Sequence, residues 1–344
     1  MRFTGKRLGS VIVALVILSG SLFAGGESET PGAPAEESKQ ITLYTSVPQN
    51  IIDNIQQDFE QKNPDVTLEV FRAGTGSTLA KLEAERESGV IHADVVWVAD
   101  FSVYETFKEE GLLMAYDAPE AQMIPERYYD PDHYYYGARL INVVLAYNTA
   151  MIKGSDVPTS WFDLLRPEVK GRVGSSNPQR SGVFFVATGA FVDNPEMGWS
   201  FFERYAQQNP PVQDSNTGIA KKIASGELLA GIALDYTIRQ MKKGGSPIDL
   251  VWPKEGVVLA PSPIGIIEDT DSPKTSKRFV SYVLSKEGQR ELTANGFVPV
   301  RRDVSRPEGV PPLEEIKYMD VDWPWLRSNR EQLISRFNTM FGID

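Results

Sequence analysis

The feature that most constrains the fold is a regular alternation of short apolar runs with segments of helical periodicity. The runs at 41–46 (ITLYTS), 66–71 (VTLEVF) and 93–100 (ADVVWVAD) are typical of strands, whereas apolar residues between 51 and 59 recur at helical spacing. The third run is almost continuously apolar, which favours a strand covered on both faces. This β-α-β order predicts an α/β fold built on a mostly parallel, doubly wound sheet.

The same alternation restarts in the second half of the chain. Strand-like runs at 142–148 (NVVLAYN), 171–176 (GRVGSS) and 228–236 (LLAGIALDY) are separated by helical patterns. Two sheets of this kind, with their helices, are too large for one hydrophobic core of usual size. The chain has 344 residues, of which 41% are hydrophobic, which is enough to form two cores. We therefore predict two lobes, each a sheet flanked by helices, joined by hinge crossings. The predicted boundaries are 40–142 with 257–344 for the first lobe and 143–256 for the second.

The N-terminus has the pattern of a secretory signal. Three basic residues among the first seven precede an apolar run at 8–18 and a zone of small residues. We expect residues 1–24 to be a signal peptide, with cleavage after Ser21 as the alternative, and 25–39 to be a flexible leader. Because the chain has no cysteine, it forms no disulfide and carries no lipidated cysteine. The mature protein is thus expected to be periplasmic or otherwise extracytoplasmic.

Three polar loops share one design, because each places small polar residues immediately before a helical pattern. Such helix starts present free backbone N–H groups and the positive end of the helix dipole, and they attract anions. For any one loop alone, ordinary helix capping is the simpler explanation. The residues concerned are Thr75, Gly76 and Ser77 in the first loop, Arg180 and Ser181 in the second, and Asn216 and Thr217 in the third.

The first of these loops differs from a nucleotide-binding P-loop. A P-loop continues from its last glycine into Lys, whereas Gly76 is followed by Ser77 and Thr78. No ammonium group is therefore set against a phosphate for metal-assisted chemistry, and neutral donors suit reversible capture. Arg180 is the one basic residue inside the three loops. We expect its guanidinium either to donate two parallel hydrogen bonds to an anion or to remain solvated at the surface.

Acidic residues follow two of the predicted buried strands. Asp100 ends the run 93–100, and Asp235 and Tyr236 end the run 228–236. In open α/β sheets ligands collect at the carboxyl ends of strands, which makes these side chains binding candidates. Capping of the next helix is the alternative role for an aspartate in this position.

The sequence gives little support to catalysis, metal binding or nucleic-acid binding. His92 and His133 are its two histidines, and neither a G-x-S-x-G nor an H-E-x-x-H pattern occurs. A net charge of −11 opposes contact with nucleic-acid phosphates. We expect no catalytic residue, metal site or cofactor. A secreted hydrolase that uses two carboxylates remains the alternative from another functional class.

Several segments resemble periplasmic substrate-binding proteins of ABC importers. They include ITLYTSVPQ, ADVVWVAD, VPTSWFDLLRPEVKGRV, ASGELLAGIALDY and LSKEGQREL, and the resemblance covers nearly all of the mature chain. It implies the type II binding-protein fold, in which a monomer captures a small solute between two lobes and delivers it to a membrane permease. The branch that it resembles contains binders of ferric iron, thiamine, phosphonates and hexose phosphates.

Within that branch the sequence motifs are most similar to those of the hexose-phosphate binders, which implies a phosphorylated or otherwise anionic ligand. Ferric binders carry two adjacent tyrosines where this chain has Tyr236 and Thr237, so iron is the weaker alternative, together with thiamine. Asp100 and Tyr236 keep the iron alternative open. By this resemblance, the expected ligand-binding positions are Ser46, Thr75, Ser77, Ser181, Asn216, Thr217, Asp235 and Glu255.

Overall fold

The structure is a computed structural model, and it describes residues 38–343. The predicted signal peptide and nearly all of the predicted leader lie outside the described residues. None of the helices between residues 38 and 343 has the length and apolar character that crossing a bilayer requires.

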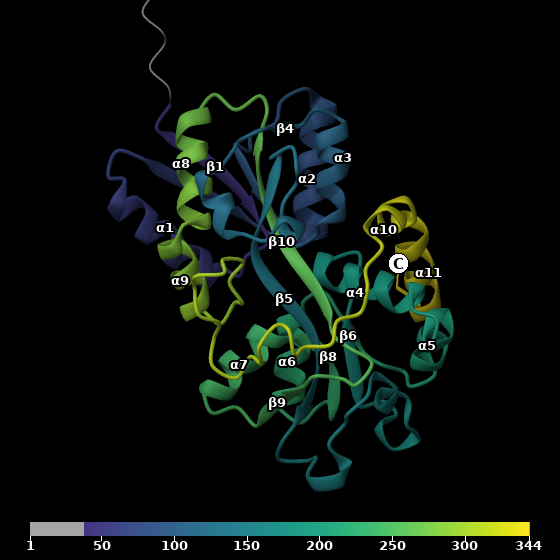
Figure 1. Ribbon diagram of the computed structural model, residues 1–344. Coiled ribbons are helices and arrows are strands. Elements are labelled where there is room, and N and C mark those ends of the chain that lie inside the picture. Colours follow the sequence, from purple (N-terminus) through teal and green to yellow (C-terminus); the bar gives the residue numbers. More distant parts are fainter. Residues whose placement is uncertain (1–37, 344) are drawn as a thin grey trace, which may run out of the picture. The chain divides into compact units, whose positions relative to one another are not determined.

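The described chain is organised around a ten-stranded mixed sheet (Figure 1). The strand order is β2-β1-β3-β10-β5-β8-β6-β7, with β4 paired to β10 and β9 paired to β5. The bounds are β1 Gln40–Thr45, β2 Thr67–Arg72, β3 Val95–Trp97, β4 Leu113–Met114, β5 Tyr135–Asn148, β6 Val173–Ser176, β7 Val212–Gln213, β8 Ala230–Leu234, β9 Ile248–Val251 and β10 Val258–Ile267.

Two long antiparallel strands connect the two halves of this sheet. β5 pairs with β10 from Tyr135 to Val143 and then with β8 and β9 up to Asn148. On one side β1 is parallel to β2 and β3, and on the other β6 is parallel to β7 and β8. The α/β prediction is confirmed, and each half has the expected parallel core. The antiparallel pairing arises because the chain enters and leaves the second half along β5 and β10.

Helices cover both halves. Those of the first half are α1 Gln49–Lys62, α2 Thr75–Ser88, α3 Ser102–Glu109, α8 Pro273–Leu284 and α9 Lys286–Ala294. Those of the second half are α4 Gly182–Asp193, α5 Gly198–Ala206, α6 Asn216–Ala224 and α7 Asp235–Lys243. The apolar residues between 51 and 59 form the buried face of α1, as their spacing predicts.

The segment SWFDLL, which lies between the strand-like runs 142–148 and 171–176 where the sequence predicts helical structure, forms only a short 3-10 turn at Trp161–Leu165. Pro158 and Pro167 stand on either side of it, and a proline disfavours helical conformation in the residue before it and removes a backbone donor. The turn is fixed by a capping box between Ser160 and Asp163.

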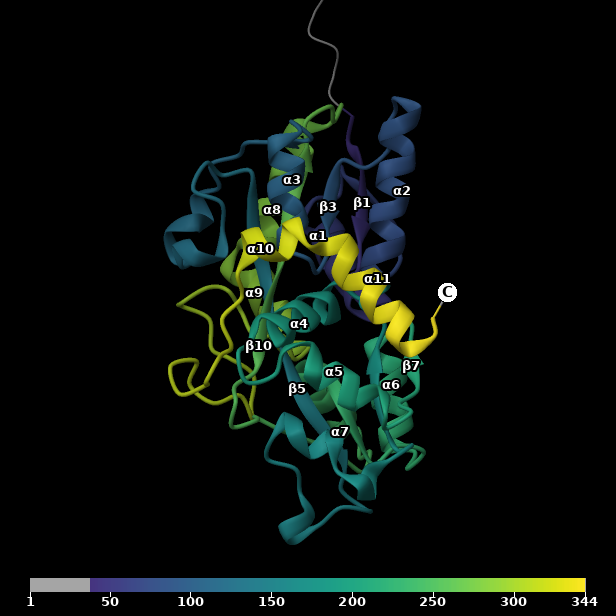
Figure 2. The same cartoon turned by 90° about the vertical axis from the view of Figure 1, so that its right-hand side faces the viewer.

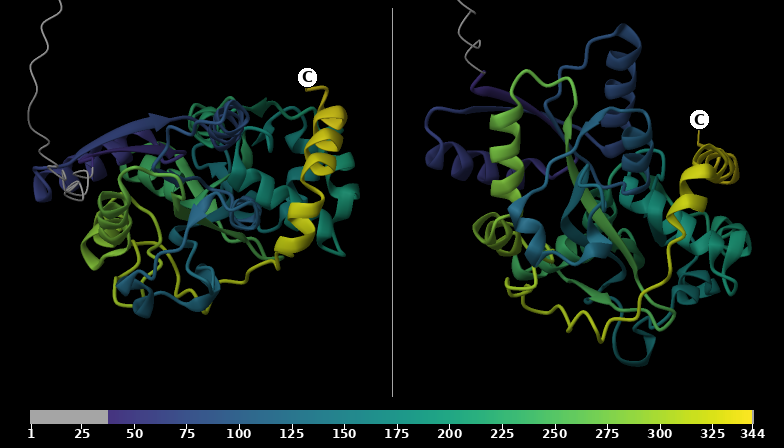
Figure 3. Two further views of the ribbon diagram at one scale, coloured as in Figure 1. Left: turned by 90° about the horizontal axis from the view of Figure 1, so that it is seen from above. Right: turned by 45° about the horizontal axis from the view of Figure 1, so that its top comes forward.

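The chain ends in two helices, α10 Trp323–Ser328 and α11 Arg330–Phe341, which contact both halves (Figure 2). α10 packs against α3 of the first half, and α11 packs against α4 and α5 of the second. Figure 3 shows these helices and α8 on opposite sides of the sheet. By its contacts α11 therefore joins the second half, although its sequence range falls within the predicted first lobe.

Arg330 is central to this bridge. Its guanidinium forms an ion pair with Asp100, which is completely buried at the end of the first-half strand run. The same group lies over the ring of Phe185 in α4, 4.3 Å from its centroid. One side chain of the C-terminal segment thus neutralises a buried charge in the first half and packs on the second.

We predict that Arg330→Ala lowers the free energy of unfolding by about 3 kcal/mol, because it leaves the buried Asp100 carboxylate without a cation. The measurement is urea denaturation followed by fluorescence. The matched control is Arg336→Ala in the same helix, whose pair with Glu203 is solvent-exposed and should contribute less than about 1 kcal/mol. Equal losses in the two variants would contradict the role given to Arg330.

Candidate functional site

A small cavity of about 80 Å³ lies between the two halves of the sheet, and we refer to it as the cleft. Residues of both halves and of the connecting strand β5 line it. They are Ser46, Pro48, Arg72, Gly74, Thr75, Ala99, Arg139, Ile141, Arg180, Ser181, Gly182, Val183, Asp214, Ser215, Asn216, Thr217, Leu234 and Tyr236. Seven of the twelve candidate positions from the sequence are therefore brought together: Ser46, Thr75, Arg180, Ser181, Asn216, Thr217 and Tyr236.

Two helices of the second half begin at the cleft and are tied to each other. Ser181 caps α4 by accepting a hydrogen bond from the backbone N–H of Phe184, at 3.2 Å. The side-chain amide of Asn216, the first residue of α6, donates to Ser181 Oγ at 2.8 Å and accepts from Ser176 Oγ at 2.8 Å. These bonds hold both helix starts toward one space, so that their dipoles favour an anion there.

A third helix, α2, meets them from the first half. Thr75 is its first residue, and the residue before it is glycine, which supplies no capping side chain. The next backbone N–H, that of Gly76, donates to the carbonyl of Arg180 at 3.3 Å across the two halves. Gly76 therefore serves contact between the halves. Ser77 is exposed and does not line the cleft.

Glycines make this close contact possible. A Cβ atom on Gly182 would lie 2.5 Å from the carbonyl oxygen of Ala99 and 2.8 Å from Thr75 Cγ2, both in the first half. One on Gly76 would collide with the carbonyl oxygen of Gln179. These backbones touch only because neither residue has a side chain.

The acidic candidates have partners inside the protein. Asp100 accepts from the backbone N–H and hydroxyl of Ser102 and from Arg330. Asp235 is completely buried and accepts from the backbone and side-chain amides of Asn142, at 3.2 and 2.9 Å, and from Arg239 at 3.1 Å. Neither aspartate lines the cleft, so Asp235 is not placed to accept sugar hydroxyls directly.

Glu255 lies away from the cleft. Its carboxylate accepts from the hydroxyl of Ser160 at 2.6 Å and from the backbone N–H of Trp161 at 3.1 Å. It therefore caps the 3-10 turn of the PTSWFDLL segment. The sequence resemblance placed it among the ligand-binding positions, but its oxygens are engaged in fixing this turn.

Two further candidates have defined places in the cleft wall. The Ser46 hydroxyl accepts from the backbone N–H of Ala99 at 3.1 Å, which holds the first strand–helix connection against the third strand. Tyr236 is 6% exposed, and its ring packs on Phe297 with centroids 4.2 Å apart.

The most unusual residue of the cleft, Arg139, was missed from the sequence. It lies in the middle of β5, is only 2% exposed, and its Nε and Nη1 atoms are buried without any hydrogen-bond partner. Its guanidinium carbon lies over the Phe297 ring at 4.4 Å and near the Trp97 ring at 5.6 Å. A single cation within the apolar run YYGARLINVVLAYN is the signal that marks it in the sequence.

Burial acts directly on the charge of Arg139. Loss of hydration is the main cause that lowers the pKa of its guanidinium to about 10; Tyr236 opposes this shift, and nearby Arg72 contributes to it. The group stays protonated at neutral pH but is not compensated. Among the residues that line the cleft, three carry guanidinium groups (Arg72, Arg139 and Arg180) and only Asp214 carries a carboxylate.

Within residues 38–343 there is no group of three or more His, Cys, Asp or Glu side chains that could hold a metal ion. The cleft is instead lined in the manner of an anion site, by helix starts, hydroxyl groups and three arginines, of which Arg139 has two buried nitrogens without a hydrogen-bond partner.

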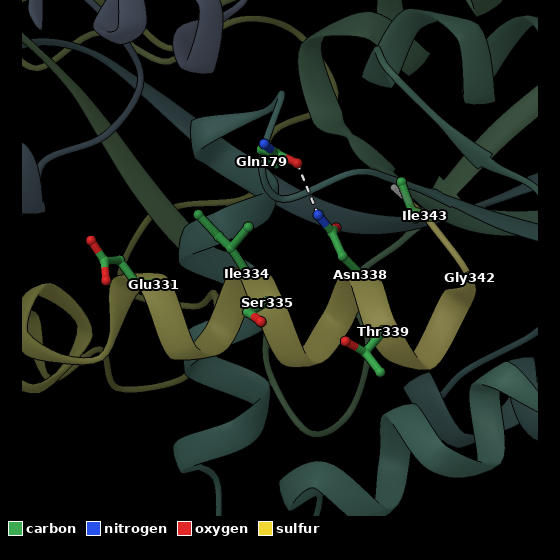
Figure 4. Close-up of a pocket in the computed structure, with 8 residues that line it drawn as sticks. All are labelled: Gln179, Glu331, Ile334, Ser335, Asn338, Thr339, Gly342 and Ile343. Carbon is green, nitrogen blue, oxygen red and sulfur yellow. Dashed lines mark hydrogen bonds between the residues drawn. The ribbon is translucent and has the colours of Figure 1, made fainter.

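The loop that carries Arg180 and Ser181 is also anchored on its outer side. Gln179 Oε1 accepts from the side-chain amide of Asn338 in α11, at 2.8 Å (Figure 4). An open groove runs along α11 beside this contact, lined by Gln179, Glu331, Ile334, Ser335, Asn338, Thr339, Gly342 and Ile343. The C-terminal helix therefore supports one wall of the cleft.

Comparison with known proteins identifies the class. Residues 91–329 match the family described as bacterial extracellular solute-binding protein. The chain belongs to this family. It is therefore a solute-binding protein that acts outside the cytoplasm, in a family of transport proteins rather than enzymes.

Relatives and one solved structure agree with this assignment. The chain is 26% identical to spermidine/putrescine-binding periplasmic protein 1 of Haemophilus influenzae, over 85% of this chain and 83% of that protein. It is 23% identical to a putative 2-aminoethylphosphonate-binding periplasmic protein of Salmonella typhimurium, over 79% and 82%. The periplasmic binding protein AfuA of Actinobacillus pleuropneumoniae, solved with fructose-6-phosphate, matches with a TM-score of 0.81 and 25% identity over 89% of this chain and all of AfuA. The type II binding-protein fold expected from the sequence is confirmed.

We predict that Gly182→Ala weakens solute binding at least tenfold, because a methyl group at this position collides with the Ala99 carbonyl and holds the halves apart. Isothermal titration calorimetry with the bound solute measures the effect. Gly244→Ala is the control, since a methyl group there meets atoms only at ordinary contact distance. Unchanged affinity in Gly182→Ala would show that this contact plays no part in binding.

We also predict that Arg139→Met raises the free energy of unfolding of the ligand-free protein by about 1–3 kcal/mol, because it replaces an uncompensated buried charge with an apolar side chain of similar length. Urea denaturation of protein freed of ligand by partial unfolding and dialysis measures this. Arg127→Met is the control, because Arg127 is exposed and bonded to Tyr128. A large loss of stability in Arg139→Met would refute the claim that the charge is uncompensated.

Proposed function

We propose that the protein captures a small anionic solute, with a hexose phosphate favoured, between two lobes and delivers it to the membrane permease of an ABC importer. The observation that carries this proposal is the charge of the cleft, where three guanidinium groups face a single carboxylate and one of them, Arg139, is buried without a partner. An anion supplies the missing counter-charge. A monomer that makes no contact with nucleic acid suffices for this role.

A phosphoryl group fits the helix starts of the second lobe. The backbone N–H groups at the beginning of α4 and α6 offer donors in several directions, as a tetrahedral group requires. Ser181, Asn216 and Thr217 supply side-chain groups around them, and Arg180 adds a charge at the rim. This is the arrangement of neutral donors that the three polar loops predict.

Capture requires the two lobes to move. Residues of both lobes line the cleft, so a solute that contacts both walls enters and leaves only when the lobes separate. We infer that rotation about β5 and β10, the two strands that join the lobes, provides this opening. The solute stabilises the closed form only by its preference for that form, and a shift from 1:99 to 99:1 takes about 5.5 kcal/mol.

The same charges oppose the alternative ligands. Polyamines, thiamine and ferric iron are cations, and moving them beside the exposed Arg72 and the buried Arg139 incurs charge repulsion. Iron would also lack its usual anionic oxygens, since Tyr236 supplies one phenol and Asp100 is paired with Arg330. A hydrolase with two carboxylates is disfavoured because Asp214 is the one acid among the described lining residues.

The test is calorimetric titration of the mature protein with glucose 6-phosphate, glucose, spermidine and ferric citrate. We expect binding of the phosphate ester and none of glucose or spermidine. Asn216→Asp should weaken the binding of the phosphate ester at least about 30-fold, because it places a carboxylate at the start of α6.

The control for that variant is Asn194→Asp, the same change at a turn outside the cleft, where Asn194 Oδ1 accepts from the backbone N–H of Glu196. It should bind like the wild type. Preferential binding of spermidine by the wild-type protein would refute the anionic ligand, and preferential binding of ferric citrate, an anionic complex, would refute the hexose phosphate.

A further inference from the structure

Arg139 stands apart from the other polar groups of the cleft by its surroundings. It belongs to the connecting strand β5, whereas Ser181 and Asn216 belong to helix starts of the second half. Its neighbours are the rings of Phe297, Trp97 and, by its effect on the guanidinium charge, Tyr236. The helix starts offer many neutral donors, while this end of the cleft offers one buried cation between aromatic side chains.

A buried guanidinium needs a charged partner of its own. Charged side chains are almost never fully buried unless they are paired. Of the carboxylates in this region, Asp235 pairs with Arg239 and Asp100 with Arg330, while Asp214 lines the cleft but is exposed to solvent. A phosphoryl group at the helix starts accepts hydrogen bonds from the N–H groups of α4 and α6. It leaves the charge of Arg139 to be neutralised by another part of the solute.

The shape of this end of the cleft selects the kind of partner. Because the guanidinium lies over the Phe297 ring, a partner must reach its N–H groups along the edge of the guanidinium plane. A carboxylate is planar and accepts two parallel hydrogen bonds from such an edge. A phosphoryl group can pair with the same fork, but it is bulkier than a carboxylate and needs more room beside the rings of Phe297 and Trp97.

We propose that the solute carries two acidic groups, a phosphoryl or phosphonyl group at the starts of α4 and α6 and a carboxylate paired with Arg139. This inference rests on the proposed function and narrows it to phosphorylated or phosphonylated carboxylic acids. Arg139 is then the residue that distinguishes such acids from simple sugar phosphates.

The experiment compares two pairs of compounds that differ in a carboxylate: 6-phosphogluconate with glucose 6-phosphate, and 3-phosphoglycerate with glycerol 3-phosphate. Calorimetry gives the dissociation constant of each for the mature protein. We expect the acid of at least one pair to bind about tenfold or more tightly than its partner, as a charged hydrogen-bonded contact implies. In Arg139→Lys, which keeps the charge and loses the planar fork, the ratio within that pair should fall to about one.

Arg127→Lys is the matched control, since Arg127 also lies over an aromatic ring, that of Tyr128, but outside the cleft. It should keep the wild-type ratio. If glucose 6-phosphate binds and neither acid binds better than its partner, or if Arg139→Lys keeps the ratio, this inference is wrong while the proposed function stands. If no phosphorylated compound binds, both fail. If fructose 1,6-bisphosphate binds tenfold more tightly than fructose 6-phosphate, the partner of Arg139 is a second phosphoryl group and the carboxylate assignment is wrong.

Discussion

The antiparallel pairing of β5 with β10 is the constraint on which the rest of the structure depends. These two strands are the path by which the chain enters and leaves the second half of the sheet, and both are buried along nearly their whole length. Each half builds its own parallel strands and helices outward from them. The cleft lies between the halves, and β5, one of the two strands that join them, lines it through Arg139 and Ile141.

This position explains why a costly residue can be kept in β5. A guanidinium buried among aromatic rings destabilises the ligand-free protein, since it loses its hydration without gaining a partner. The same loss becomes useful when an anion enters, because an ionic hydrogen bond in a dry site is stronger than one in water. Under the proposed function, the protein gives up stability of its ligand-free form at the point where an anionic solute restores it.

The acidic residues near the cleft serve the opposite purpose. Asp235 and Asp100 are buried like Arg139, but each has a cation and amide or hydroxyl donors as partners. They fix the start of α7 and the attachment of the C-terminal helices, and they add no free negative charge to the cleft. The bridge through Arg330 also means that α10 and α11 contact both halves, so closure of the cleft and the packing of the C-terminus are physically linked.

The sequence by itself determined the local elements and the helix starts, since periodicity, capping residues and glycines act over a few neighbours in the chain. It therefore predicted the α/β class, the parallel strands and the helix starts at Ser181, Asn216 and Thr217, while their assignment to one ligand site came from the family resemblance. Only the tertiary structure decided which charges are free, because the partners of Asp235, Asp100 and Glu255 come from distant segments. Asn142 lies 93 residues from Asp235 and Arg330 lies 230 residues from Asp100. Arg139 is the converse case: whether a cation in an apolar strand is paired depends on neighbours that fold against it from far along the chain, and none of them brings a carboxylate.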